Sequence, residues 1–60
     1  MKQFHLIRSS SDKSGNRLYL FHTGNYQYEI SILARDVWVT AMKIDGDVEE
    51  AIALLEKMAG

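Results

Sequence analysis

Two histidines, His5 and His22, are the first residues that could carry out chemistry, because imidazole titrates near neutral pH and binds metal ions. A catalytic or metal-binding histidine needs identifiable partners. The sequence contains no cysteine, and no carboxylates stand near either histidine in the pattern of a ligand set. We therefore interpret both histidines as structural or surface residues and predict neither a metal ion nor a cofactor.

Four serines between Ser9 and Ser14 could supply a nucleophile. A catalytic serine requires a positioned base and an oxyanion donor, commonly at a strained turn such as G-x-S-x-G. The sequence has no such arrangement here, and the neighbouring residues are polar or turn-forming with nothing to bury. We predict a flexible polar loop at residues 9–16, no catalytic residue and no enzymatic activity.

Acidic residues between Asp45 and Glu56 fall at positions 1, 3, 5 and 12 of a calcium-binding EF-hand loop. Glu50, however, stands where the sharp turn of that loop requires glycine. The apolar pattern from Val48 to Met58 also requires these residues to be helical already. Helix capping explains the acids better, so we predict no calcium site.

Aromatic residues are concentrated in residues 17–28, which also contain Arg17, and Lys13, Arg8 and Arg35 lie nearby in the sequence. Single-stranded nucleic acids bind to aromatic stacking platforms that are flanked by positive charge. An alternative function is therefore single-stranded nucleic-acid binding, and the residues that it assigns are Lys13, Arg17, Tyr19, Tyr26 and Tyr28. The same aromatic residues are needed for the core, and the net charge of −1 lacks the strongly basic balance of duplex DNA binders.

The length of 60 residues predicts one α+β domain over residues 1–60. Hydrophobic residues make up 47% and charged residues 25%, which is typical of a globular protein and excludes a disordered chain. So short a chain has a small core, and without cysteine it has neither disulfides nor the commonest structural zinc site. Self-association is the expected source of further stability.

Charge is divided unevenly along the chain. Residues 1–35 carry five basic and two acidic side chains, whereas residues 36–60 carry two basic and six acidic ones. Net charges of +3 and −4 can orient a partner or a second copy of the chain. The sequence shows neither the apolar segment of a secretory signal nor a run long enough to cross a bilayer, so we expect a cytoplasmic protein that does not contact membranes.

A small antiparallel sheet of three or four strands is predicted, with strands at about residues 2–8, 17–23 and 26–33. Gly24-Asn25 fits a two-residue hairpin turn, which places Phe21 opposite Tyr28 and Tyr19 opposite Ile30. The predicted core face comprises Tyr19, Phe21, Tyr26, Tyr28, Ile30 and Ile32. The second face comprises Leu18, Leu20, His22, Gln27, Glu29, Ser31 and Leu33. A slip of one residue would exchange these faces.

A fourth strand at about residues 37–43 is favoured by the β preference of Val37 to Thr40. Helical spacing of Val37, Ala41 and Ile44 leaves a helix at residues 36–44 as the alternative. The sequence of residues 41–52 resembles the last two helices of ubiquitin-associated modules, which implies the helical alternative. The order of four strands and a helix resembles, in topology, small dimeric transcriptional coactivators that bind single strands.

An amphipathic helix at about residues 47–59 closes the chain. Asp45-Gly46 breaks the preceding segment, Asp47 is a good N-cap, and Glu50 follows at the spacing of a capping box. The apolar stripe of this helix comprises Val48, Ala51, Ile52, Leu55 and Met58 or Ala59. We expect this stripe to cover the core face of the sheet.

The second face of the sheet is too apolar for a surface left in water. If the strands align, Trp38 joins Leu18, Leu20 and Leu33 in one patch, and such patches mark contact sites. We therefore predict a non-enzymatic protein-interaction module, an adaptor, inhibitor or regulator, with Leu18, Leu20, Leu33 and Trp38 at the protein interface. The expected partner is a second copy, which forms a homodimer, or another protein; no small-molecule substrate is evident.

Overall fold

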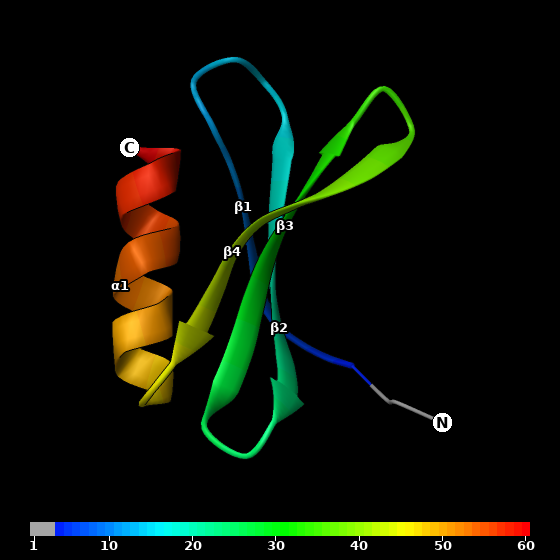
Figure 1. Cartoon of the computed structure of the whole chain (residues 1–60). Helices are drawn as coiled ribbons and strands as arrows, with labels where there is room; N and C mark the ends of the chain where they lie inside the picture. The colour runs from blue at the N-terminus through cyan, green and yellow to red at the C-terminus, as the bar shows by residue number, and fades with distance from the viewer. Residues whose placement is uncertain (1–3) are drawn as a thin grey trace.

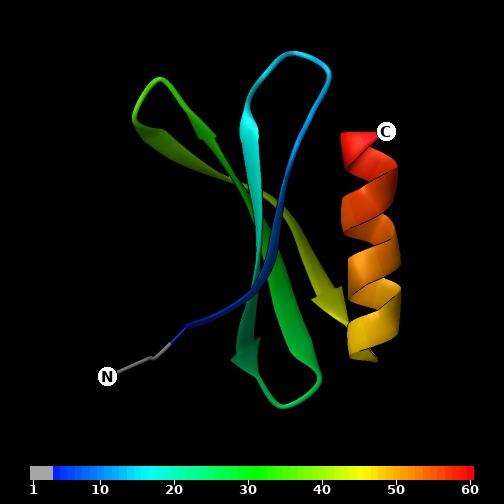
Figure 2. The same ribbon diagram turned by 180° about the vertical axis from the view of Figure 1, so that it is seen from behind.

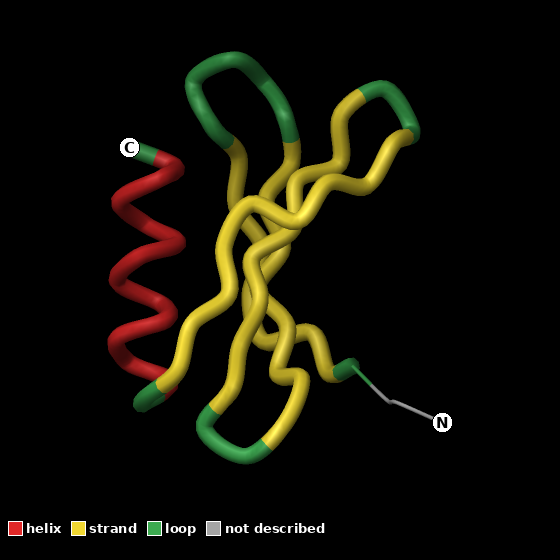
Figure 3. Tube along the Cα trace, in the orientation of Figure 1, coloured by secondary structure: helices red, strands yellow, loops and turns green. Residues whose placement is uncertain are grey.

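The computed structural model describes residues 4–60 as four strands followed by one helix, an α+β arrangement (Figures 1 and 3). The elements are β1 (His5–Ser11), β2 (Arg17–Gly24), β3 (Gln27–Ala34), β4 (Val37–Asp45) and α1 (Val48–Ala59). The predicted fold class is confirmed, and residues 37–43 form a strand rather than a helix. The first two residues of the predicted first strand lie outside the described residues.

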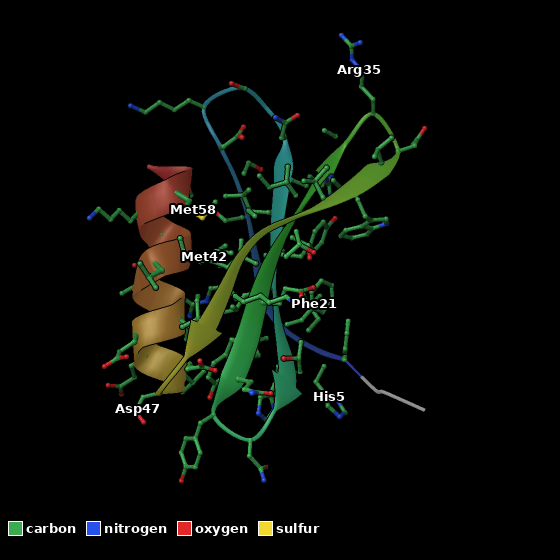
Figure 4. All side chains as sticks on the ribbon, viewed as in Figure 1. His5, Phe21, Arg35, Met42, Asp47 and Met58 are labelled. Atoms are coloured by element: carbon green, nitrogen blue, oxygen red, sulfur yellow. The ribbon has the colours of Figure 1, made fainter. Side chains whose placement is uncertain are left out.

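The strands form one antiparallel sheet in the order β1-β2-β3-β4, and α1 packs on one face of it (Figures 1 and 2). Contacts of α1 fall mainly on β1 and β2 and to a lesser extent on β3. The core lies between these two layers. Its buried residues are Leu18, Leu20, Tyr28, Ile30, Ile44, Ala51 and Leu55. Figure 4 shows Met42 and Met58 on the helix side of the sheet, where they pack against the same core.

The predicted register of the β2–β3 hairpin is wrong by one residue. His22 pairs with Tyr28, Leu20 with Ile30 and Leu18 with Ile32. The turn residues are Asn25 and Tyr26, and the left-handed φ of 56° falls at Tyr26 instead of Gly24. A bulge between His22 and Gly24 adds one residue to β2, and one added residue reverses which side chains face the core.

The correction exchanges the faces of β2, while those of β3 from Gln27 onward remain as predicted. Tyr26, which was predicted to join the core face, is a turn residue and is 71% exposed. Leu18 and Leu20 are fully buried beneath α1 together with Ile30. Tyr19 and Phe21, which were predicted to form the core, lie instead on the face away from the helix, where Figure 4 shows Phe21. Two leucines beside Ile30 give the helix an aliphatic surface, and aromatic residues are left for the opposite face.

The β1–β2 loop is shorter than the predicted residues 9–16, because Ser9 to Ser11 continue β1 in pairing with β2. Asp12 closes the rest of the loop: its carboxylate accepts hydrogen bonds from the backbone N–H groups of Ser14 and Asn16, both at 2.9 Å. Such a turn built on an aspartate side chain replaces hydrogen bonds that the backbone cannot make. Gly15 supplies the positive φ of 87° within it.

Helix α1 begins and ends close to its predicted bounds, with Asp47 as the N-cap residue and Gly60 at the C-cap. The Asp47 side chain makes no capping hydrogen bond, so the predicted cap is present in position only. Ala51 and Leu55 are buried, which confirms the core of the predicted stripe. Arg8 of β1 forms an ion pair with Glu56 of α1 at 3.0 Å, and this contact ties the helix to the edge of the sheet.

Candidate functional site

The face of the sheet away from α1 carries a cluster of rings that we call the aromatic face: Phe4, Tyr19, Phe21 and Trp38. The centroids of Tyr19 and Trp38 are 5.1 Å apart, and each of these rings lies 6.2 Å from Phe21. Phe4 extends the cluster, since its ring lies 6.2 Å from that of Phe21. These distances are typical of aromatic pairs that stabilise one another.

Strand pairing explains why the rings meet. Tyr19 and Phe21 alternate along β2 and therefore share one face, while Trp38 reaches the cluster from β4 across β3. Between them stands Ser31, which pairs with Tyr19 on one side and with Thr40 on the other. Because Ser31 is small, the rings can close over β3, and Ser31 is itself buried beneath them.

A hollow of about 280 Å³ opens in the aromatic face. Its lining consists of Phe4, Phe21, Ser31 and Trp38, and most of the exposed lining is apolar. Trp38 remains 55% exposed beside it. The hollow can therefore accommodate an apolar side chain of a binding partner, and it lacks the polar groups of a catalytic site.

Polar residues of both signs flank the aromatic face. Glu29 and Lys43 stand opposite each other on β3 and β4, and Arg17 begins β2 at the other end of the same face. Ser9 pairs with Tyr19 from β1. An apolar centre with a mixed polar rim is the usual anatomy of a protein–protein contact surface.

The predicted interface residues are divided between the two faces. Leu33 pairs directly with Trp38, and both lie on the open face. Leu18 and Leu20 were assigned to that patch wrongly, because the bulge in β2 turns them under α1. Sequence reasoning assigned no functional role to Phe4 or Phe21 and gave Tyr19 one only in the alternative. Recognition of the bulge between His22 and Gly24 would have placed Tyr19 and Phe21 on the open face and so identified this surface.

The residues of the nucleic-acid alternative are not brought together. Tyr19 lies on the aromatic face, Tyr28 is buried in the core, and Tyr26 stands 71% exposed in the β2–β3 turn. Lys13 and Arg17 lie at the opposite end of β2, around the β1–β2 loop. The structure thus separates two of the three tyrosines from the positive charges assigned to accompany them.

His5 and His22 stand opposite each other in the β1–β2 pairing. His22 was predicted to lie on the second face, but it shares the core face with Leu20, and its ring stacks on that of Tyr28 at 5.1 Å. An open hollow of about 450 Å³ adjoins this pair and is lined by His22, Asn25, Tyr26 and Tyr28. Within residues 4–60, no group of three or more histidines and acids could hold a metal ion.

Comparison with known proteins gives no match: no protein-family model fits the chain, and no curated protein and no solved structure matches it. Over the described part of the chain, no helix has the length and apolar character required to cross a membrane.

Proposed function

We propose that this chain is a small, non-enzymatic, homodimeric protein-interaction module that acts in the cytoplasm as an adaptor, inhibitor or regulator. The observation that supports the proposal is the aromatic face: a connected cluster of four rings on a sheet whose other face is covered by α1. Exposed apolar patches on small proteins mark contact sites, and buried aromatic anchors dominate the energy of such contacts.

Binding would centre on the hollow between Phe21, Ser31 and Trp38. An apolar side chain of the partner would enter it and exclude water from the surrounding rings. Arg17, Lys43 and Glu29 would supply polar contacts at the rim, where they add specificity more than affinity. Rings already packed on one another lose little conformational freedom on binding, which favours a preformed surface.

Single-stranded nucleic-acid binding is the second candidate function. The position of Tyr19 on the open face of the sheet is the observation that supports it. This ring is the one tyrosine of the assigned set on the open sheet face, and aromatic residues in that position stack on bases in sheet-based RNA-binding domains. Protein binding is the better supported of the two, because the rings of Tyr19 and Trp38 cover each other and Glu29 offsets the positive charge of the face.

The test uses two substitutions at the bottom of the hollow. Ser31→Val fills part of the hollow with methyl groups, whereas Ser31→Ala leaves it open, and both remove a long 3.4 Å hydrogen bond to Glu29. Peptides selected from a displayed random library against the immobilised wild-type protein serve as the probe. We expect these peptides to bind Ser31→Ala as they bind wild type, and Ser31→Val about tenfold more weakly.

The fluorescence of Trp38 locates the binding, because Trp38 is the single tryptophan of the chain and lies on the aromatic face. We expect selected peptides to shift its emission to shorter wavelength as they exclude water from the indole. Equal binding to Ser31→Val with unchanged Trp38 emission would remove the aromatic face as the binding surface. Salt-sensitive binding of a mixed-sequence oligonucleotide that changes the same emission would favour the second candidate instead.

A further inference from the structure

The outer edge of β4 is a second candidate contact surface, since no other strand within residues 4–60 pairs with it. Strands β1 and β4 are the two edges of the sheet, and an edge strand presents unpaired backbone N–H and C=O groups. Every residue from Val37 to Ala41 is exposed, and three large apolar ones follow one another: Val37 at 59%, Trp38 at 55% and Val39 at 50%. Side chains alternate along a strand, so this stretch is open on both faces of the sheet.

The position of the β3–β4 turn explains why α1 leaves this stretch bare. Figures 1 and 2 show the turn projecting away from α1, and Figure 4 shows Arg35 at its tip. Only the second half of β4 approaches the core, where Met42 packs against it and Ile44 is buried. Residues 37–41 therefore form a projecting edge that nothing within residues 4–60 covers.

The two edges of the sheet differ in the protection that they carry. The outer strand β1 has polar residues at Ser9 to Ser11, a bulge between Leu6 and Arg8, and the ion pair of Arg8 with Glu56. Natural proteins use such charges, polar residues and bulges to prevent edge-to-edge pairing. By contrast, β4 has no charged residue from Val37 to Met42. It pairs regularly with β3 from Val37 to Thr40, and its own irregularity, at Ala41, falls at the end of the exposed stretch.

We propose, on the basis of the homodimeric part of the proposed function, that a second copy of this chain pairs antiparallel with β4 through residues 37–41. The two-fold axis lies at Val39, the centre of the exposed stretch. Val39 of one copy then stands opposite Val39 of the other, and Trp38 stands opposite Thr40 of the second copy. The two four-stranded sheets become one continuous sheet.

A second copy is the occupant that fits this edge because the exposed stretch is complementary to itself. β-branched residues opposite each other stabilise neighbouring strands, and no charged side chain within residues 37–41 meets its own copy across the axis. In this register Asp36 of one copy stands opposite Met42 of the other, and the turn residue Arg35 stands opposite Lys43, so the charged residues lie outside the five paired positions. The contact uses the same patch twice, as a two-fold interface requires.

The five paired residues, among them two valines and Trp38, make a small contact compared with the roughly 1,200 Å² or more of standard stable interfaces. We therefore expect a reversible dimer with a dissociation constant on the order of micromolar. A two-fold axis perpendicular to the sheet places both aromatic faces on the same side, next to the axis. The dimer would thus present two hollows to one partner and raise its affinity through bivalency.

The experiment places a single cysteine on the full chain, which has none of its own. Val39→Cys is treated with a short bismaleimide, and Ser9→Cys on the opposite edge, also exposed, is the matched control. We expect rapid cross-linking of the dimer at Val39→Cys and none at Ser9→Cys. Sedimentation equilibrium then compares wild type with Val39→Thr, which keeps the β-branch, and with Val39→Lys, which sets like charges opposite each other.

We expect Val39→Thr to dimerise as wild type does and Val39→Lys to dimerise at least about tenfold more weakly, while circular dichroism shows that both fold. A wild type that stays monomeric at high micromolar concentration would overturn the inference. So would a dimer that persists in Val39→Lys and does not cross-link at Val39→Cys. Neither result affects peptide binding at the aromatic face, which Ser31→Val tests on its own; conversely, cross-linking at Val39→Cys would stand if no peptide bound.

Discussion

The ring of Trp38 lies 5.1 Å from that of Tyr19 at an interplanar angle of 51°, although a whole strand, β3, separates their strands. The contact exists because Ser31 is the residue between them, and a serine leaves room for two large side chains to lean together. Trp38 stands opposite Leu33, which lies two residues beyond Ser31 on β3 and on the same face. The contact between Tyr19 and Trp38 therefore depends on β2, β3 and β4 together, and its geometry depends on the small residue Ser31 at the centre.

A double-mutant cycle on Tyr19→Ser and Trp38→Ser measures this contact. We expect a coupling free energy of about 0.5–1.5 kcal/mol beyond the separate losses, which is usual for tilted aromatic pairs. Denaturant unfolding of the four proteins gives the value. Tyr26→Ser with Trp38→Ser is the matched control, because Tyr26 stands in the β2–β3 turn, and here we expect additive effects. A coupling equal to that of the control would show that the two rings do not interact in solution.

The register of β2 predicts that Leu20→Ala is strongly destabilising. Leu20 is fully buried beneath α1, and truncation of a buried leucine costs about 2–5 kcal/mol of the free energy of unfolding. In a domain this small, that loss is comparable with the whole stability, so we expect a protein largely unfolded at room temperature. Leu6→Ala is the control: Leu6 is 54% exposed on the open face, and we expect a loss below about 1 kcal/mol. Similar losses at the two leucines would favour the register predicted from the sequence.

Much of this fold follows from sequence patterns that extend over many residues. The stripe of α1 repeats over three turns, and the β preference of Val37 to Thr40 outweighed its helical alternative, so both elements form as predicted. The register of β2 could not be predicted in the same way, because one extra residue in the bulge before Gly24 decides it. Turn chemistry favoured Gly24-Asn25, but burial of Leu18 and Leu20 under α1 outweighs that local preference.

The error in the register of β2 also prevented a correct prediction of the aromatic face. Trp38 and Leu33 were placed correctly on the open face, since neither depends on β2. Tyr19 and Phe21 were assigned to the core because aromatic and β-branched residues pair well, and the opposite assignment pairs Leu20 with Ile30 equally well. Pairing preferences alone cannot separate these registers, whereas the aliphatic surface required by Ala51 and Leu55 of α1 can.

The β3–β4 turn predicts a stabilising substitution. Arg35 and Asp36 have φ angles of 51° and 65°, and non-glycine residues in this left-handed region are strained by roughly 1 kcal/mol each. We expect Asp36→Gly to raise the free energy of unfolding by up to about 0.5 kcal/mol, and the melting temperature with it, after the greater freedom of glycine in the unfolded chain is deducted. Thermal unfolding followed by circular dichroism measures the change.

Gly15→Ala is the opposite control for this prediction. Gly15 has φ of 87°, and a Cβ atom there would meet nothing within 4 Å, so only the backbone conformation opposes the alanine. We expect a loss of about 1 kcal/mol. If Asp36→Gly lowered the stability, the turn would owe more to the Asp36 side chain than to its φ angle.

The hydrogen bonds of Asp12 predict that removal of its carboxylate destabilises the β1–β2 loop. Its Oδ1 atom accepts hydrogen bonds from the backbone N–H groups of both Ser14 and Asn16 at 2.9 Å. Asp12→Ala leaves these donors to water and should lower the free energy of unfolding by about 1–2 kcal/mol, because bonds to a charged acceptor are the stronger kind. Asp12→Asn retains an acceptor oxygen and the same turn, so we expect less than half of that loss. Hydrogen exchange distinguishes the variants: the amide of Asn16 should exchange much faster in Asp12→Ala and only slightly faster in Asp12→Asn, and equal rates in both would mean that the carboxylate does not order this loop.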